Sequence, residues 1–259
     1  MKAGVVVFPG SNCDHDVYHV LKHVTAQDAN FLWHDDADLH GSDLVVLPGG
    51  FSYGDYLRAG AMAAQSPIMS AVRRHADAGG LVLGICNGFQ ILCESRLLPG
   101  ALRRNVGLRF LSQDVHLRVE RSDLPWTQRL KRGQVLRMPI AHGDGAYFDL
   151  PAKLDALEKA GQVVFRYASP AGELDAANEE WNPNGSQRAI AGICNQAGNV
   201  LGLMPHPERC SEALLGNRDG LELFRSVVDA MAAAATERRP RRAGLAPGGR
   251  TEGARGAAR

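Results

Sequence analysis

Short apolar runs alternate with helix-like segments through the first hundred residues of the chain. Such alternation is typical of a parallel sheet that helices cover on both faces. Apolar and β-branched residues predict strands at 5–8, 30–34, 44–47 and 81–85.

Apolar residues at helical spacing predict two helices. After Cys13, the positions i, i+3, i+4 and i+7 are apolar and form one helix face. These residues are Val17, Val20, Leu21 and Val24. The inner face of a last helix is predicted to carry Phe224, Val227, Val228 and Met231.

The middle of the chain departs from this pattern. Val115, Leu117 and Val119 alternate with polar residues, and residues 134–140 form another extended run. Alternation of this kind predicts an antiparallel insertion or edge, because one face of such a strand meets the core and the other meets water.

Two later apolar runs, at 189–194 and 200–204, flank the turn residues Gly198 and Asn199. They predict a β-hairpin that leads into the segment 204–209. The expected fold is therefore α/β, a single-domain three-layer sandwich with a mostly parallel central sheet and an antiparallel extension.

Composition separates a folded body from a tail. The 259 residues are 45% apolar, enough for a substantial core. The net charge of +1 conceals seven arginines from Thr236 onward, against only Glu237 and Glu252. Without that segment the body carries about −4, which argues against a basic nucleic-acid reader. We expect a domain at 1–235 and a disordered Arg/Gly/Ala-rich tail at 236–259.

The remaining composition favours a cytoplasmic protein. No apolar run is long enough to cross a bilayer, and the N-terminus enters a strand-like run with no signal-peptide pattern. The cysteines are odd in number and widely spread, with no CxxC pair and no metal-ligand spacing. We therefore expect free thiols in a reducing compartment and no metal site.

A candidate nucleophile, Cys86, stands in the run LVLGICNGFQIL at 81–92. An apolar strand, G-x-C-x-G and an apolar helix start predict a strained strand-to-helix turn that Gly84 and Gly88 relieve. The helix N-terminus would favour a thiolate there. The alternative is an ordinary buried cysteine.

Two other cysteines are weaker candidates. Cys93 lies about two helical turns after Cys86 and is expected in the core. Cys13 is expected near an exposed loop, and no residue close to it in the sequence resembles an activating base.

A candidate base and its orienting carboxylate occur in the run MPHPER at 204–209. Two prolines flank His206 and favour an extended segment, in which residues two apart project to the same side. Glu208 would then lie beside His206 and fix its ring. A lone His-x-Glu also occurs by chance on protein surfaces.

The strand at 44–47 ends in Pro48, Gly49 and Gly50, whose backbone N–H groups could stabilise an oxyanion. The N–H of Asn87 would be the second donor. A plain glycine turn is the alternative. The sequence has no GxxxxGK[ST] loop and no GxGxxG after a strand, so ATP binding is expected on a partner.

These features together resemble the triad-type (class I) glutamine amidotransferases, which combine a PGG loop, a GxCxGxQ elbow and a late HxE. Within that family the chain is similar to the small stand-alone glutaminase subunits of phosphoribosylformylglycinamidine synthase. The strings that carry the resemblance are FPGSNCD at 8–14, PGGFSYGDYLRAGA at 48–61, GICNGFQIL at 84–92, PIAHGDG at 139–145, NPNGS at 182–186 and MPHPER.

The resemblance implies a flavodoxin-like fold and hydrolysis of glutamine to glutamate and ammonia in purine biosynthesis. Cys86 would form a glutamyl thioester, His206 would act as base and then acid, and Glu208 would orient it. Gln90 would contact the substrate glutamine, and the loop at His142 and Gly143 would hold its amino-acid end. Gly50, or less favourably Gly49, would be the oxyanion donor with Asn87.

The resemblance also implies partners. Ammonia would pass to a separate synthase subunit that binds ATP and magnesium, with a small third subunit in the same complex and no cofactor in this chain. Two departures stand out: Asp144 replaces an expected glutamate, and the arginine-rich tail extends past the usual end.

Two other functions remain open. Another cysteine hydrolase could use the same elbow, for example a γ-glutamyl hydrolase or a different amidotransferase branch, although the long string GFSYGDYLRAG at 50–60 speaks against it. A catalytically silent regulatory subunit is the second alternative.

Overall fold

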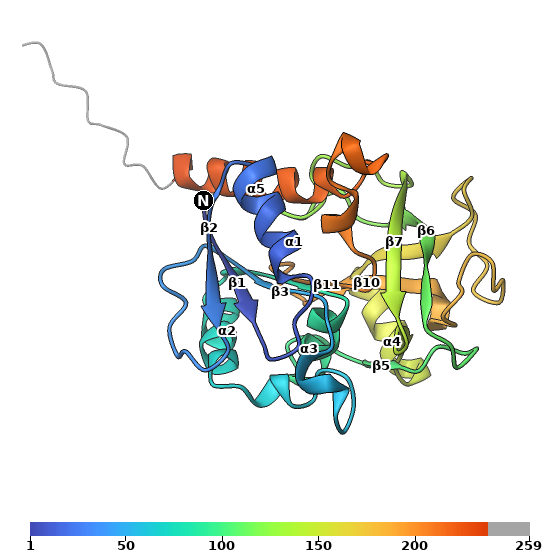
Figure 1. Cartoon of the computed structure of the whole chain (residues 1–259). Helices are drawn as coiled ribbons and strands as arrows, with labels where there is room; N and C mark the ends of the chain where they lie inside the picture. Colours follow the sequence, from blue (N-terminus) through green and yellow to red (C-terminus); the bar gives the residue numbers. More distant parts are fainter. Residues whose placement is uncertain (238–259) are drawn as a thin grey trace, which may run out of the picture.

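The computed structural model describes residues 1–237, and its centre is one nine-stranded sheet (Figure 1). Five neighbouring strands form a parallel half, in which every adjacent pair runs in the same direction. In spatial order they are β2 (Asp28–Trp33), β1 (Lys2–Val7), β3 (Leu44–Leu47), β4 (Leu81–Ile85) and β11 (Val200–Leu203).

The other half of the sheet is antiparallel and begins where β10 pairs with β11. It continues the order with β10 (Ile190–Cys194), β9 (Val163–Ala168), β6 (Leu111–Val119) and β7 (Val135–His142). A separate two-stranded sheet joins β5 (Ala101–Arg103) to β8 (Ala146–Phe148).

Helices cover the parallel half on both faces, with α1 and α5 on one side and α2 and α3 on the other (Figure 1). The α-helices are α1 (Asp14–His19), α2 (Ile68–Asp77), α3 (Asn87–Glu94), α4 (Pro151–Lys159) and α5 (Leu221–Glu237). Short helical turns are η1 (Val20–Val24), η2 (Ser52–Asp55), η3 (Ala63–Gln65), η4 (Gln187–Ala189), η5 (Pro207–Cys210) and η6 (Ala213–Leu215).

The expected α/β three-layer fold with a mostly parallel sheet and an antiparallel extension is confirmed. The strands at 44–47 and 81–85 have the predicted bounds, and the predicted hairpin is β10 and β11. Sequence analysis had not placed β9, α2 or α4.

The helix predicted after Cys13 is real but changes type midway. Val17, Val20 and Leu21 are buried as expected. From Val20 onward the backbone forms a π-helical turn, which the Thr25 hydroxyl closes by donating to the carbonyls of Val20 and Leu21 at 3.1 and 2.9 Å. The wider turn keeps the apolar face on the sheet while it ends the helix.

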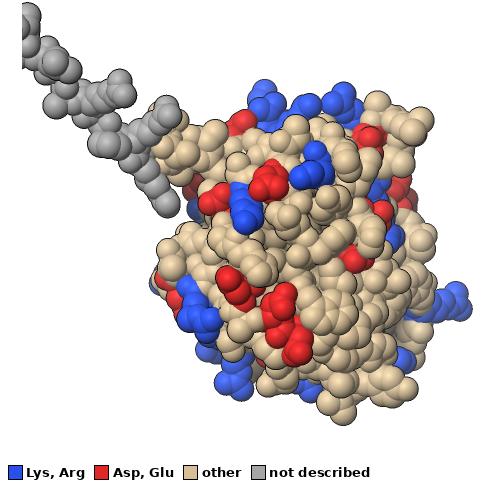
Figure 2. All heavy atoms as spheres, turned by 60° about the vertical axis from the view of Figure 1, so that its left-hand side comes forward, with Lys and Arg blue, Asp and Glu red and all other residues tan. Residues whose placement is uncertain are grey.

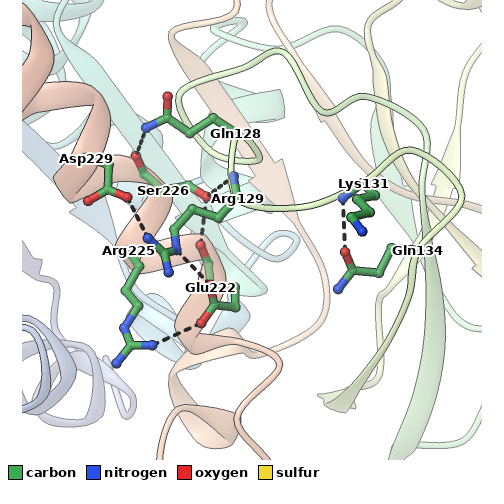
Figure 3. A network of polar contacts seen from close by, with 8 residues as sticks. All are labelled: Gln128, Arg129, Lys131, Gln134, Glu222, Arg225, Ser226 and Asp229. Carbon is green, nitrogen blue, oxygen red and sulfur yellow. Dashed lines mark hydrogen bonds and ion pairs between the residues drawn. The ribbon is translucent and has the colours of Figure 1, made fainter.

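A polar network ties α5 to the loop that precedes β7 (Figure 3). The Arg129 guanidinium reaches Glu222 and Asp229, each at 2.8 Å, and its backbone N–H donates to the Ser226 hydroxyl at 3.1 Å. Beside this network Trp126 is fully buried and donates to the Gly198 carbonyl at 2.8 Å. The C-terminal helix is thus fixed to both halves of the sheet.

The last described helix crosses the domain boundary expected at 235. Helix α5 includes Thr236 and Glu237, two residues of the segment expected to be disordered. The rest of the expected tail, 238–259, lies outside the described residues.

The face of the molecule seen in Figure 2 carries Lys and Arg interspersed with Asp and Glu, without a continuous basic patch. This agrees with the charge of the body and gives no footprint for nucleic acid on that face. Among residues 1–237, no helix is both long and apolar enough to span a membrane.

Candidate active site

The candidate catalytic residues follow the carboxyl ends of three adjacent parallel strands and lie at one edge of the sheet. Gly49 and Gly50 follow β3, Cys86 follows β4, and His206 comes three residues after β11. The carboxyl ends of parallel strands meet at the same edge, which is where α/β sheets bind their ligands. The backbone N–H of Cys86 donates to the Leu203 carbonyl at 2.8 Å and fixes the two strand ends in register.

Cys86 occupies the strained turn that the sequence predicted. Its φ is +50° and its ψ is −106°, a conformation that L-residues rarely adopt. The two glycines leave no room for side chains, because a Cβ on Gly88 would lie 1.9 Å from the Leu47 carbonyl oxygen and one on Gly84 would lie 2.6 Å from that of Gly88. Helix α3 can therefore start directly against β3 and β4.

His206 and Glu208 form a buried pair, with His206 Nδ1 2.6 Å from Glu208 Oε1. A carboxylate accepts only, so Nδ1 carries the proton and Nε2 is the nitrogen left for chemistry. Nε2 is buried and has no hydrogen-bond partner of good geometry among the described residues. The pair thus holds one imidazole nitrogen toward the strand ends.

The local conformation of this pair differs from the prediction. His206 is extended, but Pro207 to Cys210 form a 3₁₀ turn rather than an extended segment. Proline is well suited to the first position of a helical turn, where its missing N–H costs nothing. The predicted contact between the His206 and Glu208 side chains is present, but the extended backbone predicted for this segment is wrong from Pro207 onward.

The pKa of His206 is raised well above its ordinary value. Burial alone would lower it, but the negative charges of Glu208 and the Cys86 sulfur outweigh the desolvation, with smaller contributions from the Cys13 and Cys86 sulfurs as acceptors for the imidazolium. His206 is therefore held as an imidazolium, the form that can give a proton to a leaving group.

Gly50 and Asn87, the two residues expected to stabilise an oxyanion, keep their backbone N–H groups unpaired within residues 1–237. Gly50 has φ +148°, and a Cβ there would lie 2.7 Å from the Asn12 nitrogen and 2.8 Å from the Gly10 carbonyl oxygen. Only glycine can bring this backbone so close, which fits an oxyanion-binding position.

The carboxyl end of β7 lies against the thiol, and the loop that follows it starts at Gly143. The Ala141 carbonyl oxygen lies 3.6 Å from Cys86 Sγ. Asn105 fixes residues 142–145 through its side chain. Its Nδ2 donates to the His142 carbonyl at 2.8 Å, and its Oδ1 accepts from the Gly145 N–H at 3.0 Å. The Gly143 carbonyl in turn accepts from the Asn105 N–H at 2.9 Å. His142 and Gly143 thus lie at the site on a braced loop.

The His142 ring is buried and neutral. Its Nδ1 donates to Asn105 Oδ1 at 3.1 Å, so its buried, unpartnered Nε2 is a free acceptor. Burial, with a smaller contribution from the charge on His206, lowers the pKa of His142 to about 4. This nitrogen can accept a hydrogen bond from an ammonium group.

Both polar atoms of the Gln90 side-chain amide form hydrogen bonds within the protein. Its Oε1 accepts from Asn87 Nδ2 at 2.8 Å, and its Nε2 donates to the Asp144 carbonyl at 2.6 Å. Asn87 Nδ2 also lies 3.4 Å from Asp55 Oδ1. Burial and the nearby charge of Asp144 raise the pKa of Asp55 to about 6. Gln90 therefore links the elbow helix to the loop at 142–145.

Cys13 was expected near an exposed loop, and that expectation is wrong. It is buried, and it offers its sulfur within 4.8 Å of ligand atoms of His206 and Glu208. Arg209 Nη2 donates to the Cys13 sulfur at 2.9 Å. Its place at the start of α1 gives no sequence signal of this proximity. Only the packing of α1 against the turn η5 brings it to the histidine.

Sequence reasoning also missed Asn105 and Asp55. Asp55 ends the short helical turn η2 and Asn105 lies in a loop, positions where aspartate and asparagine are common for turn-forming reasons. Nothing in their immediate sequence distinguishes a residue that braces a catalytic loop from one that closes a turn.

Comparisons with known proteins agree with this geometry. A family described as the CobB/CobQ-like glutamine amidotransferase domain matches residues 1–225. Phosphoribosylformylglycinamidine synthase subunit PurQ of Koribacter versatilis is 58% identical, over 90% of this chain and 99% of that protein. The PurQ subunit of Gloeobacter violaceus is 57% identical over 88% of this chain and 97% of its own length.

The chain belongs to the PurQ family of glutamine amidotransferases.

Solved structures extend the match to three dimensions. A chain in the structure of PurLQS from Thermotoga maritima shares 43% identity and a TM-score of 0.78, over 89% of this chain and 98% of that one. The glutaminase domain of Trypanosoma brucei CTPS is 14% identical with a TM-score of 0.55, over 91% of this chain and 94% of that one, and shares the fold alone. The PurQ resemblance predicted from sequence motifs is confirmed.

Replacement of Gly88 by alanine tests the close packing at the elbow. A Cβ 1.9 Å from the Leu47 carbonyl oxygen must displace backbone. We expect the free energy of unfolding to fall by about 3 kcal/mol or more, the upper range of overpacking. Gly107→Ala is the matched control, since a Cβ there meets nothing within 4 Å. Chemical denaturation measures the free energy of unfolding of both variants. An equal loss in Gly88→Ala and Gly107→Ala would contradict the close packing assigned to Gly88.

The pKa of His142 predicts an acid-dependent stability. Its folded value of about 4 lies below the ordinary 6.5, so the unfolded chain binds more protons between these values. Stability should therefore fall as pH drops through this window, by up to about 3 kcal/mol relative to His142→Gln. Urea unfolding of both proteins at pH 7, 5.5 and 4.5 measures the difference. A difference that does not vary with pH would show that His142 is not buried neutral.

Proposed function

We propose that Cys86, His206 and Glu208 hydrolyse glutamine to glutamate and ammonia, as the glutaminase of phosphoribosylformylglycinamidine synthase in purine biosynthesis. The observation that carries the proposal is the buried His206–Glu208 pair beside a cysteine held at φ +50° on a glycine-flanked turn. The PurQ relatives bear the name of a subunit of that synthase.

The first half-reaction breaks the amide of the glutamine side chain. The Cys86 thiolate attacks the amide carbon and forms a C–S bond, and the carbonyl oxygen becomes an oxyanion. The N–H groups of Gly50 and Asn87 stabilise this charge. The protonated His206 transfers its Nε2 proton to the leaving nitrogen, the C–N bond breaks, and ammonia departs from a glutamyl thioester.

The second half-reaction hydrolyses the thioester. His206, now neutral, accepts a proton from water as the water oxygen attacks the same carbon. The C–S bond breaks, Cys86 recovers the thiolate and glutamate leaves. Glu208 keeps Nδ1 protonated and stabilises the imidazolium in both halves.

The loop at 142–145 suits the amino-acid end of glutamine. The unpartnered His142 Nε2 can accept a hydrogen bond from the substrate ammonium group. The carboxylate of Asp55 is near enough to Asp144 for their charges to interact, which adds negative potential for that same group. Gln90 contributes by fixing the loop to α3.

The ammonia is consumed by a synthase subunit. PurLQS is the complex named for the Thermotoga maritima structure, so a PurL-type partner that binds ATP and magnesium, and a small third subunit, complete the proposed assembly. This chain itself is proposed to act in the cytosol without a cofactor or metal, because the thiolate and the imidazolium supply the nucleophile and the proton.

Replacement of Cys86 by alanine distinguishes glutamine hydrolysis in this chain from the use of ammonia by the synthase subunit. In the reconstituted synthase, glutamine-dependent synthesis should fall at least about a thousandfold, because the nucleophile is gone. Synthesis from added ammonium salt should remain within about twofold. Product formation with formylglycinamide ribonucleotide and ATP measures both rates.

Cys93→Ala is the matched control for this experiment. Cys93 lies on the same helix, is buried, and has a pKa raised by burial well above the ordinary value, so it is a poor nucleophile. Both activities should survive. Loss of both activities in Cys86→Ala would contradict the proposed division of labour, and mass-spectrometric labelling of Cys86 by a glutamine-like electrophile would exclude a silent regulatory subunit.

A further inference from the structure

The segment 8–14 packs along the PGG turn, yet the proposed chemistry uses none of its side chains. The backbone N–H groups of Asn12 and Cys13 both donate to the Gly49 carbonyl, at 3.3 and 3.2 Å. These hydrogen bonds fix the segment to the turn that carries the oxyanion donor. They also place one thiol, that of Cys13, against the candidate base.

The Cys13 sulfur lies close to both an imidazole and a guanidinium. Arg209 Nη2 donates to it at 2.9 Å, and a nitrogen of His206 lies within 4.8 Å of it. A Cβ on Gly49 would stand 2.7 Å from His206 Cε1 and 3.1 Å from the Cys13 sulfur, so the thiol and the ring flank the same glycine. Cys13 and His206 are both buried, and electrostatic contacts are stronger out of water.

The surroundings of Cys13 differ from those of three other buried thiols. Cys93 and Cys210 donate to backbone carbonyls at 3.6 Å. Burial raises the pKa values of Cys93, Cys194 and Cys210, as expected for thiols that fill the core. The Cys13 sulfur instead accepts from a guanidinium and lies beside an imidazolium. It is therefore placed as an acceptor for positively charged groups.

Glu208 alone does not fix the His206 ring. Its Oε1 lies 2.6 Å from Nδ1, whereas Nε2 is buried and has no partner of good geometry in residues 1–237. The χ2 torsion of histidine has a broad energy minimum, so a single contact leaves the ring free to swing. A second acceptor on the Cε1 side restricts that swing and stabilises the positive charge.

The other charged and titratable groups near the ring come from several elements. They are Glu208 and Arg209 from η5, Cys86 after β4, His142 at the end of β7 and Asp16 from α1, which lies 3.8 Å from Arg209 Nε. The pKa of His206 reflects burial first and then the charges of Glu208 and Cys86, and hydrogen bonding to the Cys13 sulfur adds to its rise. A Cys13 variant leaves all the other groups in place, so its pH profile reports on the sulfur.

We propose that Cys13 is a positioning residue for the glutaminase, whose sulfur, held by Arg209, orients the His206 imidazolium for proton transfer to the leaving nitrogen. The inference rests on the proposed function and extends it by one residue. The sulfur forms no bond to glutamine. It restricts the swing of the ring and stabilises its positive charge until Nε2 gives up the proton. Gly49 permits this contact, because a side chain there would press on both the thiol and the ring.

Replacement of Cys13 by alanine in the reconstituted synthase tests this role. We expect kcat for glutamine-dependent synthesis to fall about tenfold, with KM for glutamine within about twofold, because proton transfer is impaired and binding is not. The alkaline limb of the pH profile should move down by about one pH unit, since the imidazolium loses an acceptor that favours its charged form. Ammonia-dependent synthesis should stay within about twofold.

Two further substitutions distinguish a lost acceptor from lost packing. Cys13→Ser keeps an acceptor and should recover most of the rate and the position of the limb. Cys13→Val fills the space with an apolar side chain and should behave like Cys13→Ala. A residue that only packed would give the reverse order, with valine better tolerated than serine.

Cys210→Ala is the matched control. Cys210 is buried and close to His206 in sequence, but its sulfur contacts the His206 carbonyl and not the ring, so rate and limb should stay near wild type. A shifted limb in Cys13→Ala and Cys13→Val that serine restores supports the proposal. An unchanged limb in both, or an equal shift in Cys210→Ala, overturns the positioning role and leaves the glutaminase intact. Absence of glutamine-dependent synthesis in the wild-type complex overturns the proposed function itself.

Discussion

The site depends on the parallel alignment of β3, β4 and β11, which are neighbours in the sheet although β11 follows β4 by more than a hundred residues. Parallel strands end at the same edge of the sheet, so the PGG turn, the Cys86 turn and the MPHPER segment lie next to one another at that edge. The hydrogen bond from the Cys86 N–H to the Leu203 carbonyl fixes their register. Without this alignment Cys86 would be a buried cysteine and His206 a buried histidine.

Burial and charge act in opposite directions at the centre of the site. Desolvation by itself would neutralise His206, yet the adjacent carboxylate and sulfur raise its pKa. A buried charge is tolerable when it is paired and hydrogen-bonded, and the 2.6 Å contact with Glu208 meets that condition. His142, which follows the residue that covers the thiol, lacks such a carboxylate partner and stays neutral. Two histidines therefore have opposite charge states in one site.

Backbone strain at the nucleophile is maintained by the fold itself. Cys86 has φ +50°, and the glycine-lined contact between α3 and β3 imposes the turn. Strain that the surrounding packing imposes in this way preorganises the position of a nucleophile.

The sequence by itself determined the fold class, the elbow, the contact between His206 and Glu208, and the family, because each is carried by neighbouring residues or by local periodicity. It also suggested Gly50, through the family resemblance that the PGG loop carries. Cys13 and Asn105 could not be found this way. Their positions arise from segments distant in the chain that pack together, and the burial that brings a thiol to an imidazole is decided only when the whole sheet and its loops assemble.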